Sequence, residues 1–418
     1  MALLAALGLF ILLGMLAPTP AHAQALHARL AGSVPADGSV LAEPPALIRL
    51  VFSEPVQIAG QPITVLAPSG AEVERGPAQV NGRQLTIAVD AREQGTYLVL
   101  WQVISLDTDP ANGSLIFSVG HPAGRWTGGT GQTSAFGLGV VLAAASRWLY
   151  YAGYALGFGV LAFRWLILRA LLLKNAASLE QRLWRLVTAG ILLMALAAPL
   201  ALLAQLISLA TGDLFSSALV GAVLSSRFGW VLALRLGGAL LLWVLVGAAK
   251  EGARLAVALA LALGLALALL ESLVSHSITS SQPALGLVGT TLHMLGMGLW
   301  LGGLAALLGT WRESALVPHR REVVGLFGQL AIASVVELAG SGLLLAWLHL
   351  TQWSDLFTTT YGLTLFIKGL LVPGALALAL IGRRSLLEQS QRWWQREALA
   401  LAGILALAGL LTSLAPPR

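Results

Sequence analysis

The sequence predicts a small β domain followed by a bundle of membrane-spanning helices, and three observations lead to this fold class. Apolar residues make up 57% of the 418 residues and charged residues only 11%, whereas ordinary soluble domains hold about 25% charged residues. From residue 136 onward the apolar residues form blocks of about 20 residues, the length that a helix needs to cross roughly 30 Å of hydrocarbon. Before that point, short runs of β-forming residues alternate with turn residues.

Residues 1–25 resemble a secretory signal peptide. They contain an apolar core, a proline break and small residues, and both Ala21-His22-Ala23 and Ala23-Gln24-Ala25 fit an A-x-A cleavage site. The positively charged start of such a peptide is missing, so the segment is either cleaved or kept as an anchor. In both cases we expect the residues that follow to be exported.

Five runs within residues 27–120 have the composition of β-strands, with Gly, Pro, Asn and Asp between them. The runs cover residues 48–52, 62–66, 84–89, 96–105 and 114–119. Strands at this spacing predict a small sandwich or barrel. Both faces of the run 96–105 are apolar, so we expect this strand to be central. A Gly-rich linker at 121–135 is predicted to end the domain.

Eight apolar blocks within residues 146–414 predict eight transmembrane helices. The blocks cover residues 146–168, 186–210, 228–248, 254–273, 284–310, 324–349, 362–382 and 396–414. The loops after helices one, three, five and seven hold thirteen Lys and Arg residues, whereas the other loops hold only Arg227. By the positive-inside rule this predicts a multi-pass protein of the inner or plasma membrane with an extracytoplasmic, periplasmic N-terminal domain. The net charge of +6 then reflects orientation, and we expect no nucleic-acid partner.

Ionisable residues inside membrane spans are costly and are therefore candidates for function. The predicted spans contain Arg235, Glu271, His293, Glu337 and Lys368, with His349 at the end of the sixth. In one interpretation, Arg235 or Lys368 pairs with Glu271 or Glu337 and fixes the packing of the helices. In the other, these residues form a polar pathway that opens to the outside, and the sequence leaves both interpretations open.

The fifth predicted helix combines histidine with methionine. The chain has no cysteine, so a soft metal ion would have to bind imidazole or thioether groups. His293 and Met297 share a helix face, His276 stands at the outer end of the preceding helix, and this ligand set suits copper. Gly298 and Gly302 form a small-xxx-small seam that would let another helix approach. A b-type haem held by histidines of neighbouring helices, in an electron-transfer module, is the alternative.

No nucleophile–base grouping, P-loop or dinucleotide motif occurs in the sequence. We therefore expect a binding or transport protein and not an enzyme.

Four stretches of the sequence resemble two copper-resistance families. HARLAGSVPADGSVLAEPPALIRLVFSEPV (27–56) and GTYLVLWQVISLDTDPANGSLIFSV (95–119) are similar to the periplasmic CopC family. SHS…LHMLGMGLWLGGLAAL (275–307) and DLFTTTYGLTLFIKGLL (355–371) are similar to the CopD family. The order is that of CopC–CopD fusions. The resemblance implies a CopC-like, immunoglobulin-like β-sandwich before a CopD-like membrane domain, and copper import in copper homeostasis or resistance.

The resemblance also implies a copper site in the β domain. The family holds Cu(II) with an N-terminal His, an Asp and a second His, and the matching positions are His27, Asp107 and Asp109. Asp109 replaces an imidazole by a carboxylate, and cleavage would leave Gln24 or Leu26 first, so His27 would lack the terminal amine. We therefore expect weak Cu(II) binding. A membrane scaffold with a degenerate copper site is a further alternative.

The partners implied are the copper ion, as Cu(I) or Cu(II), the lipid bilayer and periplasmic copper carriers.

Overall fold

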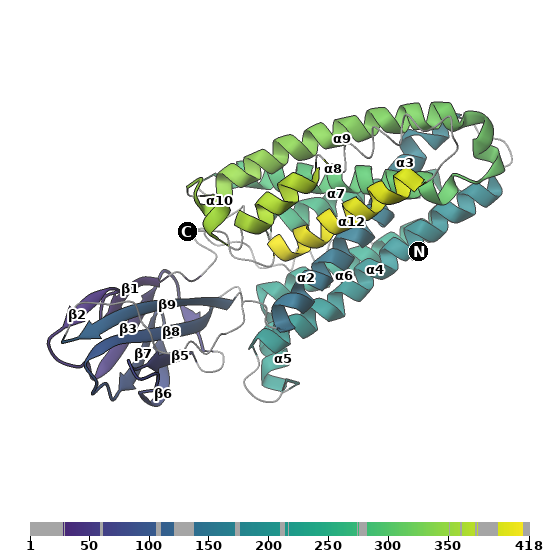
Figure 1. Ribbon diagram of the computed structural model, residues 1–418. Coiled ribbons are helices and arrows are strands. Elements are labelled where there is room, and N and C mark those ends of the chain that lie inside the picture. The colour runs from purple at the N-terminus through teal and green to yellow at the C-terminus, as the bar shows by residue number, and fades with distance from the viewer. Residues whose placement is uncertain are drawn as a thin grey trace. The chain divides into compact units, whose positions relative to one another are not determined.

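The structure, a computed structural model, describes residues 28, 30–58, 62–105, 110–120, 138–171, 176–209, 214–215, 217–273, 275, 282–350, 352–359, 362–372, 374 and 392–412. The chain separates into two compact units, one with the β domain and one with most of the helices, and each is described by itself (Figure 1). The predicted signal peptide at 1–25 and the linker at 121–135 lie outside the described residues. So do His27, Asp107, Asp109 and His276.

The described residues of the β domain form nine strands in two sheets. They are β1 (Leu30–Val34), β2 (Ser39–Leu41), β3 (Leu47–Phe52), β4 (Val56–Gln57), β5 (Ile63–Leu66), β6 (Glu74–Asn81), β7 (Gln84–Val89), β8 (Gly95–Ser105) and β9 (Pro110–Val119). One sheet has the order β1-β3-β7-β6, and the other has the order β2-β9-β8-β4 with β5 also paired to β8. Both sheets contribute to one apolar core. Of the two predicted forms, the domain is therefore the sandwich.

Strand β8 is central, as predicted, because it pairs with β9 on one side and with β4 and β5 on the other. Its inward residues Tyr97, Val99, Trp101 and Val103 are at most 3% exposed. Trp101 meets Phe52 of β3 edge-on, with 5.2 Å between the ring centroids. The period-two pattern of the sequence thus becomes the contact between the two sheets.

The helical unit opens with one long helix that changes its winding. It consists of α2 (Leu138–Tyr154), the π turn η1 (Ala155–Gly159) and α3 (Val160–Leu166), which follow one another without a break. The 3₁₀ turn η2 (Leu168–Leu171) ends the segment. At ~1.5 Å per residue, residues 138–166 extend roughly 44 Å, which is enough to cross a bilayer.

The long helices that follow are α4 (Ala177–Leu209), α6 (Arg227–Lys250), α7 (Arg254–Leu273), α8 (Pro283–Thr310), α9 (Arg320–His349) and α12 (Arg392–Leu411). Shorter elements are α5 (Ser217–Ser225), η4 (Ser314–His319), α10 (Asp355–Thr358) and the helix Gly362–Val372. The sequence did not predict α5.

Five of the described helices are long and apolar enough to cross a membrane. They are Ala177–Ser208, Phe228–Lys250, Arg254–Leu273, Pro283–Thr310 and Ser314–His349. Gly362–Val372 and Ala402–Leu411 are shorter apolar helices at the positions of the last two predicted spans. A polytopic helical domain is therefore present, while the number of eight spans remains a prediction.

Helix α4 begins at Ala177, nine residues before the predicted span. The added turns carry Glu180, which accepts a hydrogen bond from Arg164 at 2.7 Å. Charged residues of this kind are good helix formers but fall outside any apolar window. Hydropathy thus predicts the length of a span, and the helix itself extends further.

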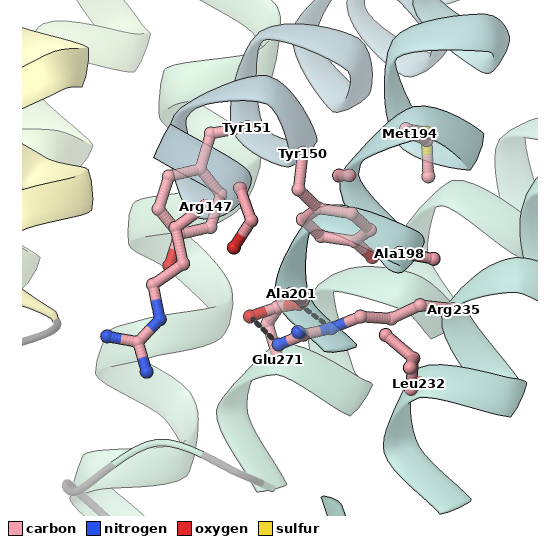
Figure 2. Close-up of a pocket in the computed structure, with 11 residues that line it drawn as sticks. Arg147, Tyr150, Tyr151, Met194, Ala198, Ala201, Leu232, Arg235 and Glu271 are labelled. Atoms are coloured by element: carbon pink, nitrogen blue, oxygen red, sulfur yellow. Dashed lines mark hydrogen bonds and ion pairs between the residues drawn. The ribbon is translucent and has the colours of Figure 1, made fainter. Parts of the chain in front are cut away.

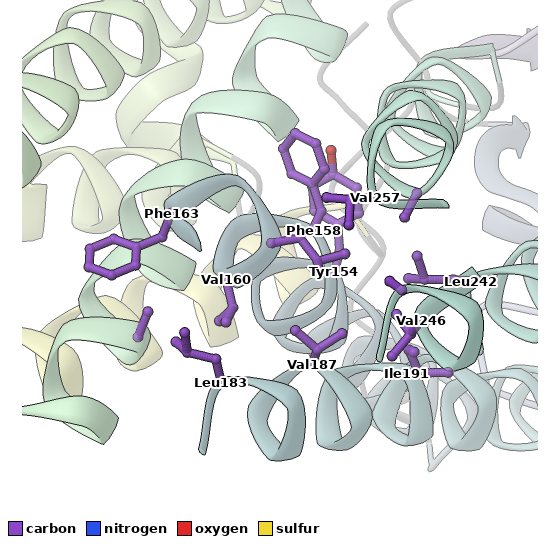
Figure 3. Packing of buried hydrophobic residues seen from close by; sticks show 14 of the residues in the cluster. Tyr154, Phe158, Val160, Phe163, Leu183, Val187, Ile191, Leu242, Val246 and Val257 are labelled. Carbon is purple, nitrogen blue, oxygen red and sulfur yellow. The ribbon is translucent and has the colours of Figure 1, made fainter. Parts of the chain in front are cut away.

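Helix α8 lies at the centre of the helical unit and contacts α3, α7, α9, α12 and the π turn. Gly159 of the π turn faces Gly298 and Gly302 of α8, and a Cβ at Gly159 or Gly302 would overlap the opposing backbone. The predicted seam of small residues on α8 is therefore the place where the first long helix approaches. Figure 3 shows the apolar cluster beside it, with Val160 near Leu183 of α4.

Candidate functional site

Three helices meet at the imidazole of His293. The residue lies on α8 with its side chain half-buried. Its Nδ1 is 3.0 Å from Oγ of Ser341 on α9, and its Nε2 is 3.4 Å from Nζ of Lys368 on the helix Gly362–Val372. Both ring nitrogens therefore have a polar partner from a neighbouring helix.

The contacts of Ser341 determine which nitrogen of His293 carries the proton. The Ser341 hydroxyl donates to the backbone oxygen of Glu337 at 2.7 Å, and a hydroxyl has only one hydrogen to donate. Its oxygen therefore accepts the bond from His293, so that Nδ1 is protonated and Nε2 keeps its lone pair. Metal-binding histidines have the same arrangement, with one nitrogen donating to the protein and the other free to bind the ion.

Two further candidates lie near this histidine on the helices that carry it. The Glu337 carboxylate is packed against Gly296 of α8, where a Cβ would be 3.1 Å from Oε2. Met297, one turn after His293, is half-buried and packs against the apolar core. A carboxylate and a thioether thus accompany the imidazole on the α8–α9 pair.

Hydroxyl groups connect α7 and α8 toward the N-terminal end of α8. The hydroxyls of Ser272 and Thr291 are 2.7 Å apart, and those of Ser275 and Thr290 are 3.5 Å apart. Thr291 is two residues before His293 in the sequence. This polar strip was missed in the sequence because serine and threonine are common in membrane helices, where they bond to their own backbone.

A second polar group, the ion pair of Arg235 and Glu271, joins α6 to α7 (Figure 2). Nε of Arg235 is 2.6 Å from Oε1 of Glu271, and the guanidinium donates a hydrogen bond of 2.9 Å to Oε2. The guanidinium also lies 5.0 Å from the ring centroid of Tyr150. Arg235 is 19% exposed and Glu271 7%, so each charge is neutralised where water is scarce. For these two residues, pairing that fixes helix packing is the interpretation that the contacts favour.

A cavity of about 10 Å³ adjoins this ion pair and is lined by Tyr150, Met194 and Leu232 among others. Its size corresponds to roughly one water molecule, so the cavity is too small for a haem or another organic cofactor. The Tyr150 hydroxyl beside it has no hydrogen-bond partner within the described residues.

The structure brings His293 together with Lys368 and, separately, Arg235 with Glu271. His349 is half-buried at the end of α9. Within the described ranges, no three His, Asp or Glu side chains gather closely enough to hold a metal ion. The contacts of His293 are with a serine and a lysine, so they give no support to the haem alternative.

Comparison with protein families covers both parts of the chain. Residues 30–120 match the CopC domain. Residues 138–287 match the Copper resistance protein D-like, N-terminal domain, and residues 321–415 match Copper resistance protein D. These three matches follow the division into a β-sandwich and a helical unit.

Similar proteins agree with this division. Copper transport protein CutJ of Bacillus subtilis (strain 168) is 26% identical over 411 residues, which cover 94% of this chain and 74% of CutJ. Copper resistance protein C of Xanthomonas campestris pv. juglandis is 32% identical over 115 residues, 25% of this chain and 90% of that protein. Copper resistance protein C of Pseudomonas syringae pv. tomato is 36% identical over 117 residues, 25% of this chain and 88% of that protein.

Two solved structures are each similar to about a fifth of the chain. CopC from Methylosinus trichosporium OB3b is 29% identical and covers 22% of this chain and 93% of its own, with a TM-score of 0.20. PcoC from Escherichia coli is 30% identical and covers 22% of this chain and 98% of its own, with a TM-score of 0.20. From the family matches and the curated relatives it follows that the chain belongs to the CopC and CopD copper-resistance families, with both joined in a single polypeptide.

Proposed function

We propose that this protein binds copper on the outer face of the inner or plasma membrane and carries it toward the cytoplasm without covalent catalysis. The relative that aligns with 94% of the chain is named a copper transport protein, and this supports the proposal. The distribution of Lys and Arg among the loops supports an N-terminal domain on the outer side.

The observation that carries the proposal is the imidazole of His293. Its Nδ1 donates to Ser341 at 3.0 Å, so its Nε2 keeps a lone pair, which faces Lys368 at 3.4 Å. Met297 is one turn further along α8 and adds a thioether. Imidazole and thioether together suit Cu(I), which is the form that we propose crosses the membrane.

We propose that the β domain receives copper outside and presents it to the helices. His27, Asp107 and Asp109 are the residues that would hold the ion there, with His276 as the first ligand on the way to His293. Because Asp109 supplies a carboxylate, the ion would be held weakly, which favours transfer over storage.

The test is the substitution His293→Gln in cells that lack other copper importers. Glutamine keeps a donor for Ser341 but has no imidazole, so we expect normal amounts of the protein in the membrane and the loss of protein-dependent copper accumulation. His349→Gln makes the same change at the end of α9, and it should lower copper accumulation less than His293→Gln does.

Wild-type copper content in His293→Gln at normal expression would contradict the proposed route. A fall in cellular copper on overexpression of the wild type would reverse the proposed direction. A Soret band in the spectrum of the purified protein would favour the haem alternative instead.

A further inference from the structure

We propose that the ammonium group of Lys368 occupies the position that copper takes at His293, so that copper binds only when this lysine leaves. The inference rests on the proposed function and adds a mechanism to it. It assigns to Lys368 the role of a tethered cation that competes with the cargo for one lone pair.

The geometry leaves a single place on the imidazole for an electrophile. Because Ser341 donates its only hydrogen to the backbone of Glu337, Nδ1 of His293 carries a proton and cannot bind a metal ion. Nζ of Lys368 lies 3.4 Å from the remaining nitrogen, Nε2. A lone pair accepts one donor or one metal ion, so the lysine and copper exclude each other at this atom.

Charge strengthens this exclusion. Within the described part of the chain, Lys368 forms no ion pair, either with Glu337, whose carboxylate lies against Gly296, or with Glu271, which is neutralised by Arg235. Lys368 and His293 are both half-buried, in surroundings where two positive charges a few ångströms apart repel far more strongly than in water. A copper ion on Nε2 would therefore displace the ammonium group as well as take its hydrogen-bond acceptor.

In this exchange one bond to Nε2 of His293 breaks and another forms, and no proton is transferred. The hydrogen bond from Nζ to Nε2 breaks, a bond from Nε2 to copper forms, and the lysine keeps its proton as its flexible four-carbon stem swings aside. When copper leaves, the lysine returns and closes the site. Ions that bind imidazole poorly, such as Na⁺, K⁺ and Mg²⁺, cannot compete with the lysine, so the same contact provides selectivity.

The experiment measures the affinity of the purified full-length protein for Cu(I) alone, in competition with a chromogenic Cu(I) chelator. Lys368→Leu removes the charge and, unlike methionine, adds no atom that binds copper, and we expect it to bind Cu(I) roughly tenfold more tightly, a usual size for coupled binding events. Lys368→Arg keeps the positive charge and should not gain affinity. Lys250→Leu makes the same replacement at the exposed end of α6 and should match the wild type.

A gain in affinity is informative because a structural defect would lower affinity. Equal affinities of Lys368→Leu and wild type, or weaker binding by Lys368→Leu, would overturn the inference. If Lys368→Leu does not accumulate in the membrane, Lys368→Gln serves for the same comparison. His293→Gln distinguishes the inference from the proposed function. Wild-type affinity in His293→Gln contradicts the proposed function, whereas loss of binding in His293→Gln together with unchanged affinity in Lys368→Leu contradicts only the role of Lys368.

Discussion

Arg235 and Glu271 neutralise each other within the helical unit. They form a close ion pair with one hydrogen bond, and the guanidinium also contacts the ring of Tyr150. Removing two charges from water is costly, and only a close contact between opposite charges offsets that cost. The loss of one partner should therefore be worse than the loss of both.

We expect Glu271→Gln to lower the thermal stability of the detergent-purified protein strongly, because it leaves the Arg235 charge uncompensated; such a change typically costs about 3–5 kcal/mol. The double variant Arg235→Met, Glu271→Leu should recover much of this loss. Thermal unfolding of the single and double variants measures both effects, with Lys250→Met as a control for removing a charge. A double variant that is less stable than Glu271→Gln would show that the pair is not coupled in this way.

At the scale of single residues, the sequence identified most of the chemistry but not its partners. It named Arg235, Glu271 and Lys368 as candidates for pairing, yet it could not choose among their partners, because it does not show which helices are neighbours. The bond between Lys368 and His293 was missed for the same reason. Ser341 was not predicted as a partner of His293, because a serine carries no charge and its burial in a membrane helix has a low free-energy cost.

At the scale of secondary-structure elements, glycines determine where the first long helix meets α8. Gly159 in the π turn and Gly302 on α8 allow two backbones to approach so closely that neither position has room for a Cβ. Close approach of this kind increases van der Waals contact, which is a main source of helix association in membranes. The α8 helix that carries His293 is held in place by this contact.

Gly302→Ala should therefore destabilise the protein and reduce its amount in the membrane, because the added methyl group would overlap the backbone oxygen of Ala155. Gly247→Ala on α6 is the matched control, since a Cβ there meets no atom within 4 Å. Alanine also has the higher helix propensity, so this second variant should be as stable as the wild type or slightly more stable. Equal stability of the two variants, measured by thermal unfolding in detergent, would contradict the packing described.

The sequence predicted these elements with uneven success. The span 254–273 agrees with α7 at both ends, because charged residues mark its start and polar residues follow its end. The π turn was not predicted, since nothing in the local sequence distinguishes an extra residue in a helical turn from an ordinary one. Strands β1, β2, β4 and β6 were also missed. Two or three residues, as in β2 and β4, are too few to show a period, and β6 contains Gly76 and Pro77, which are uncommon inside strands.

At the scale of the whole molecule, the absence of cysteine makes the predicted orientation directly testable. Ser314 begins η4 in a loop predicted to be cytoplasmic, and Ser354 lies in a loop predicted to be outside. Both serines are exposed, and replacement of serine by cysteine changes a single atom.

A membrane-impermeant maleimide should label Ser354→Cys in intact spheroplasts and should leave Ser314→Cys unlabelled until the membrane is permeabilised. The physical reason is the excess of Lys and Arg in the loops on the Ser314 side. The wild-type chain provides a blank because it has no thiol. Labelling of Ser314→Cys in intact spheroplasts would reverse the orientation and with it the proposed outer position of the β domain.

A π turn holds one residue more than the α-helical turn that it replaces. The turn brings glycines against two helices at once: Gly153 and Gly157 lie against Gly190 of α4, whereas Gly159 lies against α8. Deleting one residue between Gly157 and Gly159 would rotate Gly159 and α3 by about 100° relative to α2 and carry Gly159 away from its partner. Homologues that lack the extra residue of the π turn should therefore also lack a glycine at the position of Gly159.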